Sequence, residues 1–146
     1  MKFENHMILK MPSYPANTSL ACAAVESFAS QMGPSVVDLG DIRTAVSEAV
    51  SNSIAHAYKG TPGNINIRCR ILKDNVLDIV VKDAGTGITN IEEARKPLYT
   101  TGGKEHSGMG FTIMESFMDS CEVSSQPGKG TTVHMRKQLP RESKEG

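Results

Sequence analysis

The chain has 146 residues, of which 38% are hydrophobic and 22% are charged, and its formal net charge is zero. This length and composition predict one globular domain over residues 1–140, followed by a flexible charged tail over 141–146. A zero net charge disfavours direct binding to nucleic acid or to an anionic membrane surface. There is no run of eighteen apolar residues that could span a bilayer. Three separated cysteines, Cys22, Cys69 and Cys121, lack the spacing of a zinc site and predict free thiols in a reducing cytoplasm.

The order of predicted elements indicates the fold class. Apolar periodicity predicts strands at 6–11, 64–72, 76–82, 122–125 and 131–139, with a turn at 73–75. It predicts helices at about 17–32, 41–58, 90–95 and 108–120, and a lid-like loop at 96–107. Helices do not alternate with single strands. We therefore expect an α/β fold, a two-layer sandwich of helices on a mixed, mostly antiparallel sheet.

The two helices before residue 60 carry more detailed expectations. In the first, Leu20 and Phe28 are expected on one apolar stripe. The second shows apolar residues at a spacing of four, from Ile42 to Ile54. Gly40 is expected to interrupt this segment, so that the regular helix begins at Asp41.

Glu48 and Asn52 lie four residues apart on the second helix and therefore share one face. The neutral amide oxygen of Asn52 suits Mg²⁺, which prefers hard oxygen ligands and shares them with phosphates and water. Glu48, one turn earlier, is placed to orient or deprotonate an attacking hydroxyl group. The same pair also fits an ordinary solvated helix face.

Two glycine motifs follow further along the chain. Asp83 comes after a strand and before Gly85 and Gly87, so its carboxylate could accept a hydrogen bond from adenine while the glycines leave room for the ring. An ordinary turn explains the same residues equally well. Gly108 and Gly110 open a helix whose free N–H groups attract phosphates. Each costs the helix about 1 kcal/mol relative to alanine, which favours a functional role.

Four more polar side chains are candidates for nucleotide contacts. Lys104 and His106, in the lid-like loop, either add positive charge near the phosphates or are simply solvated. A hydroxyl of Thr131 or Thr132, at the start of a strand, could reach the edge of the base. Threonine is also a common strand residue, so this alternative stays open.

Together, the Glu48-x-x-x-Asn52 motif and the two glycine motifs resemble the GHKL (Bergerat-fold) ATPases. Within that group, the runs at 46–52, 93–101 and 107–119 closely resemble the anti-sigma-F factor family of spore-forming bacteria, and the Gly-Thr-Thr run at 130–132 agrees. The resemblance covers nearly the whole chain, and the run 107–119 is its most specific part.

This resemblance implies a cytoplasmic homodimer that is an ATP-dependent protein serine kinase, with ATP or ADP and Mg²⁺ as cofactors. It implies two partners, a sporulation sigma factor that is sequestered and an anti-anti-sigma factor that is phosphorylated. By position, Glu48 matches the catalytic base, Asn52 the magnesium ligand and Asp83 the adenine-binding carboxylate. The other matching nucleotide-binding positions are Gly85, Gly87, Gly108, Gly110 and one of Thr131 or Thr132. Further nucleotide contacts are expected from Thr100, Thr101, Lys104, His106, Ser107 and Met109.

Two positions depart from the family pattern, because Cys22 and His106 stand where arginine is usual. Three alternative functions remain open. The first is the catalytic domain of a sensor histidine kinase. The second is a nucleotide-gated sigma-binding protein without kinase turnover. The third is an anti-sigma kinase of the general stress response, which would differ only in its partners.

Overall fold

The computed structural model describes residues 3–57, 63–84, 109–126 and 130–139. Its sheet has the strand order β1-β2-β3-β5-β4, and every pair of neighbouring strands is antiparallel. The strands are β1 (Phe3–Pro12), β2 (Asn64–Leu72), β3 (Val76–Asp83), β4 (Ser120–Gln126) and β5 (Gly130–Gln138). The helical elements are α1 (Asn17–Ser30), α2 (Val36–Asn52), the π-helical turn η1 (Ser53–Ala57) and α4 (Met109–Phe117).

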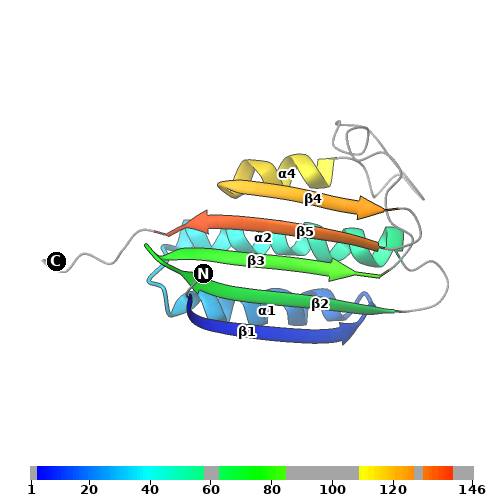
Figure 1. Ribbon diagram of the computed structural model, residues 1–146, viewed down its shortest axis with the longest axis horizontal. Coiled ribbons are helices and arrows are strands. Elements are labelled where there is room, and N and C mark those ends of the chain that lie inside the picture. The colour runs from blue at the N-terminus through cyan, green and yellow to red at the C-terminus, as the bar shows by residue number, and fades with distance from the viewer. Residues whose placement is uncertain (1–2, 58–62, 85–108, 127–129, 140–146) are drawn as a thin grey trace, which may run out of the picture.

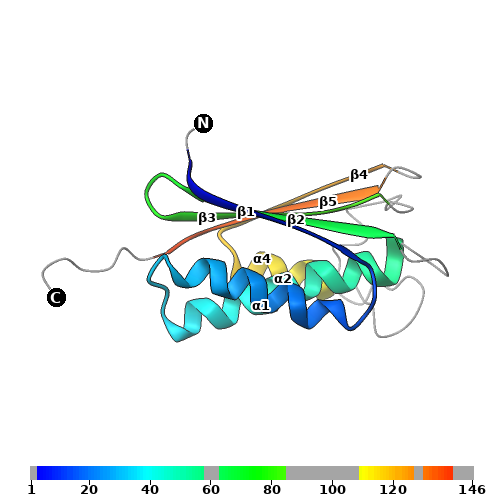
Figure 2. The same ribbon diagram turned by 90° about the horizontal axis from the view of Figure 1, so that it is seen from below.

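The helices form one layer and the sheet forms the other (Figure 1). Figure 2 shows all the helices on one face of the sheet, with the opposite face left uncovered by helices in the described part of the chain. The predicted two-layer α/β sandwich is therefore confirmed. The predicted helix at 90–95 and the lid at 96–107 lie outside the described residues, as does the tail.

The β2–β3 hairpin follows directly from its sequence pattern. On β2, the side chains of Ile65, Ile67 and Cys69 are fully buried against the helices, while the residues between them are at least partly exposed. The connecting turn has positive φ angles of 66° at Asp74 and 61° at Asn75. Both residue types tolerate this left-handed backbone region better than most, so the turn closes where the sequence predicts it.

Helix α2 begins earlier than the sequence indicates. Ser35 caps it, because its hydroxyl accepts a hydrogen bond from the backbone N–H of Asp38 at 3.0 Å, and the Asp38 carboxylate accepts one from the Ser35 N–H at 3.1 Å. The expected break at Gly40 is therefore wrong, and the helix continues through this residue. A glycine inside a helix costs about 1 kcal/mol relative to alanine, which a good cap and a buried apolar face can offset.

The buried face of α1 also differs from the expected stripe. Ala21, Val25 and Ala29 are fully buried, whereas the side chain of Leu20 is 51% exposed. The small alanines allow α1 to pack closely on α2, and Phe28 shares this face as expected. On α2, the predicted apolar face is confirmed, since Ile42, Val46 and Val50 are fully buried.

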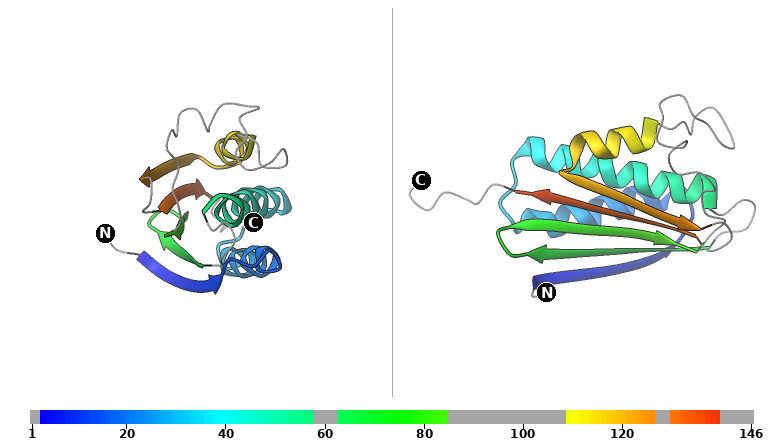
Figure 3. Two further views of the ribbon diagram at one scale, coloured as in Figure 1. Left: turned by 90° about the vertical axis from the view of Figure 1, so that its right-hand side faces the viewer. Right: turned by 45° about the horizontal axis from the view of Figure 1, so that its top comes forward.

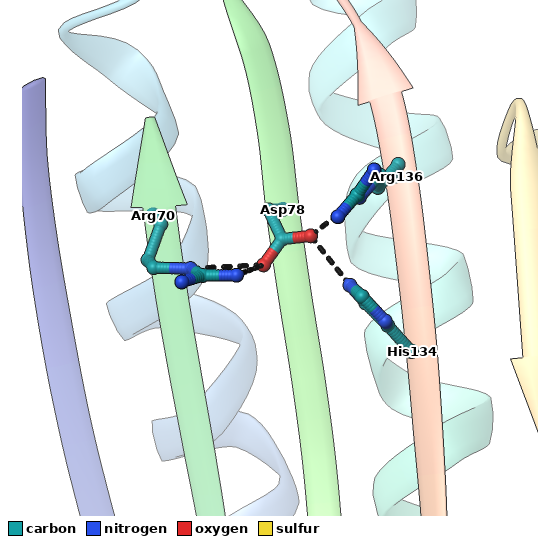
Figure 4. A network of polar contacts seen from close by, with 4 residues as sticks. All are labelled: Arg70, Asp78, His134 and Arg136. Carbon is teal, nitrogen blue, oxygen red and sulfur yellow. Dashed lines mark hydrogen bonds and ion pairs between the residues drawn. The ribbon is translucent and has the colours of Figure 1, made fainter. Parts of the chain in front are cut away.

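One buried carboxylate connects three strands on the face of the sheet that carries no helices (Figure 4). The Asp78 side chain is fully buried beneath Arg70, His134 and Arg136. One of its oxygens accepts hydrogen bonds from Arg70 at 3.1 and 3.2 Å, and the other contacts His134 and accepts a bond of 2.7 Å from Arg136. Burial alone would raise the pKa of Asp78, but the hydrogen bonds with His134, Arg136 and Arg70 lower it below its ordinary value of 3.8.

We expect Asp78→Asn to lower the free energy of unfolding by about 2 kcal/mol at pH 7, because two guanidinium groups lose their buried counter-charge. Since the native pKa is lowered, the ionised form stabilises the fold fully above about pH 4, and this contribution is lost as pH falls through the native pKa. Urea titrations at pH 7 and pH 3.5 check this. The gap between wild type and variant should narrow at the lower pH, whereas an exposed control, Glu4→Gln, should show almost no gap at either.

Candidate functional site

Four element ends that carry predicted site residues lie at the same end of the sandwich. All four ends lie at the right in Figure 1: the C-terminal ends of α2 and β3, and the N-terminal ends of α4 and β5. The rotated views in Figure 3 agree. These ends carry Asn52, Asp83, Met109 and Thr131, respectively. The topology therefore gathers residues that are as far as 79 positions apart in the sequence, counted from Asn52 to Thr131.

On α2, Glu48 and Asn52 flank the buried apolar stripe. Both side chains are half-buried, one helical turn apart, next to the fully buried Ala45 and Ala49. This edge position leaves polar groups accessible while the core side of the helix holds the backbone in place. Asn52 is the last residue of the regular helix, immediately before the π-helical turn.

Asp83, the last residue of β3, provides a carboxylate that two other elements orient. Its side chain is buried, with 4% relative exposure. One carboxylate oxygen accepts a hydrogen bond of 2.8 Å from the Ser53 hydroxyl of η1, and the other accepts one of 3.1 Å from the backbone N–H of Thr131 on β5. Two donors on different oxygens fix the plane of the carboxylate, as a hydrogen-bond acceptor for a flat ligand requires.

The sheet register distinguishes the two candidate threonines. Thr132 pairs with Lys82 and so faces the side of the sheet without helices, whereas Thr131 faces the helices on the same side as Asp83. The Thr131 hydroxyl lies 2.9 Å from the hydroxyl of Ser125 on β4. Thr131 is therefore the threonine that the fold places beside the Asp83 carboxylate.

Gly130 allows β5 to approach the end of β3 closely. Its φ is +101°, a conformation that side-chain-bearing residues rarely adopt. A Cβ atom built on Gly130 would lie 2.1 Å from the Asp83 carbonyl oxygen and 2.7 Å from the Cα atom of Ala84. Only glycine fits here, and the N–H of Thr131 reaches Asp83 because of it.

We expect Gly130→Ala to lower the free energy of unfolding by about 2–5 kcal/mol, of which about 1–2 comes from the positive φ and about 1–3 from overpacking. Gly40→Ala is the matched control, because nothing lies within 4 Å of its added methyl group. That substitution should raise stability by about 0.5–1 kcal/mol. Thermal unfolding of both variants checks this, and equal effects at the two glycines would contradict the close approach at Gly130.

Several predicted site residues lie outside the described part of the chain: Gly85, Gly87, Thr100, Thr101, Lys104, His106, Ser107 and Gly108. Met109 and Gly110 form the first residues of α4, as the predicted helix start requires. Ser53 was not among the site residues predicted from the sequence. Its signal was a hydroxyl at a position where the helical spacing of Ala49 and Val50 calls for an apolar residue.

Other features of the described residues limit the possible chemistry. They contain no cluster of three His, Cys, Asp or Glu side chains that could hold a metal ion without other ligands. None of their helices has the length and apolar character needed to cross a membrane.

The three cysteines are free, as predicted, and burial raises the pKa of Cys69 to about 12, with a further contribution from Asp78. Cys22 is buried between α1 and α2, so its thiol is not part of the exposed surface of α1.

Solved structures of two different proteins share this fold. A structure of the RsbU and RsbW domains of Rv1364c from Mycobacterium tuberculosis matches 96% of this chain and 34% of that chain, with a TM-score of 0.70 at 18% identity. The histidine kinase domain of the Erythrobacter litoralis EL346 blue-light activated histidine kinase matches 88% of this chain and 62% of that chain, with a TM-score of 0.60 at 20% identity. At these identities, the likeness concerns the fold alone.

Sequence comparisons identify the family. Residues 11–137 match the model of the histidine kinase-like ATPase domain. The anti-sigma F factor of Caldanaerobacter subterraneus subsp. tengcongensis is 49% identical over 142 residues, which cover 97% of this chain and 99% of the relative. The anti-sigma F factor of Clostridium acetobutylicum is 48% identical over 137 residues, which cover 93% and 95%. The chain therefore belongs to the anti-sigma F factor family, within the histidine kinase-like ATPase domains.

Proposed function

We propose that the chain is an ATP-dependent protein serine kinase that also sequesters a sporulation sigma factor. One observation carries the proposal. The buried Asp83 carboxylate is oriented by donors from the helix layer and from β5, at the end of the sandwich where α2 carries Glu48 and Asn52. A base-binding acceptor, a metal-ligand amide and a carboxylate base at one end of the fold are the groups that phosphoryl transfer needs.

In this proposal ATP or ADP binds with its base beside the C-terminal end of β3 and the N-terminal end of β5, and with its phosphates toward α4. The adenine amino group donates a hydrogen bond to Asp83, and Thr131 lies at the edge of the base. The phosphates lie at the first turn of α4, where Met109 and Gly110 present backbone N–H groups. The glycine loops and the lid residues named from the sequence complete the nucleotide site.

Asn52 is the proposed magnesium ligand. Its amide oxygen is a hard, neutral donor on a half-buried helix end, which fits an ion that takes only one or two ligands from the protein. The remaining ligands would be phosphate oxygens and water. When bound, magnesium neutralises negative charge on the phosphates.

Glu48 is the proposed base for the transfer step. Its carboxylate accepts the proton of the substrate serine hydroxyl while the serine oxygen attacks the γ-phosphorus. The bond from the γ-phosphorus to the β–γ bridging oxygen breaks, and ADP leaves with that oxygen. The serine belongs to an anti-anti-sigma factor, and the sequestered partner is a sigma factor.

A phosphate-transfer assay tests the function. The purified chain is incubated with radiolabelled ATP, Mg²⁺ and a candidate anti-anti-sigma factor, and the label is then followed through acid treatment. We expect acid-stable phosphoserine on the partner. Acid-labile phosphate on this chain would instead favour a histidine kinase. Absence of transfer together with intact sigma binding would favour a nucleotide-gated binding protein.

The partners and the oligomeric state need a separate measurement. Co-purification with candidate sigma and anti-anti-sigma factors, in the presence of Mg²⁺ and either ATP or ADP, reports which partner binds in each nucleotide state. Partners from the general stress response in the same experiment test that alternative. Light scattering on the purified chain tests the proposed homodimer, and a monomer mass would reject it.

A further inference from the structure

Ser53 is a hydroxyl on a stripe of α2 and η1 that is otherwise apolar. Continuing the helical spacing of Val46, Ala49 and Val50 leads to position 53, and its side chain is 6% exposed. A buried hydroxyl without a partner costs about 1–3 kcal/mol, so a serine here needs a specific acceptor. That acceptor is Asp83, 30 residues further along the chain.

The contact joins the two layers of the sandwich at the proposed base site. Because a carboxylate can only accept, the Ser53 hydroxyl must donate to it, over 2.8 Å. The N–H of Thr131 holds the other oxygen from the sheet side. Without the serine donor, the carboxylate would be held from β5 by that N–H but would lack this support from the helix layer.

We propose that Ser53 is a positioning residue for base recognition, which aims the Asp83 carboxylate at the exocyclic amino group of an adenine ring. The inference rests on the proposed function, because it requires a nucleotide with its base at Asp83. It assigns Ser53 a role in specificity: the residue favours purines with a 6-amino group and contributes little to binding of purines that lack one. Ser53 also directly follows Asn52, so one peptide bond connects the base site to the proposed metal site.

The test compares two ligands that differ by one amino group, ATP and purine riboside triphosphate, on three variants. We expect Ser53→Ala to weaken ATP binding about five- to twentyfold, and to change binding of the analogue less than twofold. Ser53→Thr, which keeps the hydroxyl, should bind ATP within about threefold of wild type. Ser51→Ala, the same change at a half-buried position two residues earlier, should bind both ligands like wild type.

The result that overturns the inference is an equal loss for both ligands in Ser53→Ala, because a purely structural role would lower both affinities together. Unchanged ATP affinity in that variant overturns it as well. Each variant is its own folding control, since the ratio of the two affinities is measured on one preparation. If wild type binds neither ligand, the proposed function itself fails, and that outcome appears before any variant is compared.

Discussion

Replacing Asn52 with alanine is expected to abolish magnesium-dependent ATP binding, with affinity falling about 100-fold or more, or about 2.7 kcal/mol. Among the described residues, Asn52 is the side chain that would hold Mg²⁺ in the proposed site, and the ion would neutralise charge on the phosphates there. Asn52 is half-buried at the end of α2, so truncating it removes polar atoms without opening a large cavity in the core. The variant should therefore keep its fold while it loses magnesium-dependent ATP binding.

Calorimetric titration with ATP, in Mg²⁺ and again in EDTA, checks this prediction. Wild type should bind more tightly with Mg²⁺, and the variant should show the same weak binding in both buffers. Thr44→Ala is the matched control, because Thr44 lies two turns earlier along the same side of the helix and hydrogen-bonds the Gly40 carbonyl. If Asn52→Ala keeps wild-type affinity and its dependence on Mg²⁺, Asn52 is not part of the site.

Local patterns predicted the parts of the fold that depend on neighbours in sequence. The alternation along β2 and the turn residues Asp74 and Asn75 fixed one hairpin, because strand periodicity and backbone preference act over a few residues. The predicted helix break at Gly40 was wrong because the capping box at Ser35 stabilises the helix and offsets the small cost of a glycine inside it. The predicted break rested on the glycine alone and took no account of the cap.

Features that depend on the register of strand pairing could not be predicted from the sequence. Asp78 and Arg136 are 58 residues apart, and they meet only because β5 pairs with β3 rather than with β2. The same pairing selects Thr131 over Thr132, since a shift of one residue would exchange the faces. The sequence of each strand alone shows the alternation of apolar and polar residues, but it does not show which strand pairs with it.

The candidate site was predictable as a set of motifs but not as an arrangement. Glu48 and Asn52 follow from helical spacing, and Asp83 from its place at a strand end. Ser53 could not be recognised, because a serine in a helix is ordinary until the structure shows that its position is buried and that its partner is a carboxylate. The proposed base site therefore contains one more contributor than the motifs indicate.

Replacing Glu48 with glutamine is expected to reduce phosphate transfer to the partner serine about 10²–10⁴-fold, the usual contribution of a general base. Glutamine has nearly the same shape but cannot take up the serine proton, so ATP affinity should stay within a few-fold of wild type. Glu48 and Asn52 therefore differ in their expected effects, although they lie one turn apart on the same helix. Glu48→Gln should abolish phosphate transfer, whereas Asn52→Ala should abolish magnesium-dependent ATP binding.

Single-turnover transfer and ATP titration on the same preparation separate these two roles. Glu115→Gln, the same change at an exposed position of α4, should leave both measurements unchanged. If Glu48→Gln lost ATP binding and transfer in parallel, Glu48 would act in holding the nucleotide and the base for the reaction would have to be another group. If it kept full transfer, the serine hydroxyl would need no base from α2, and the kinase mechanism proposed for this helix would be wrong.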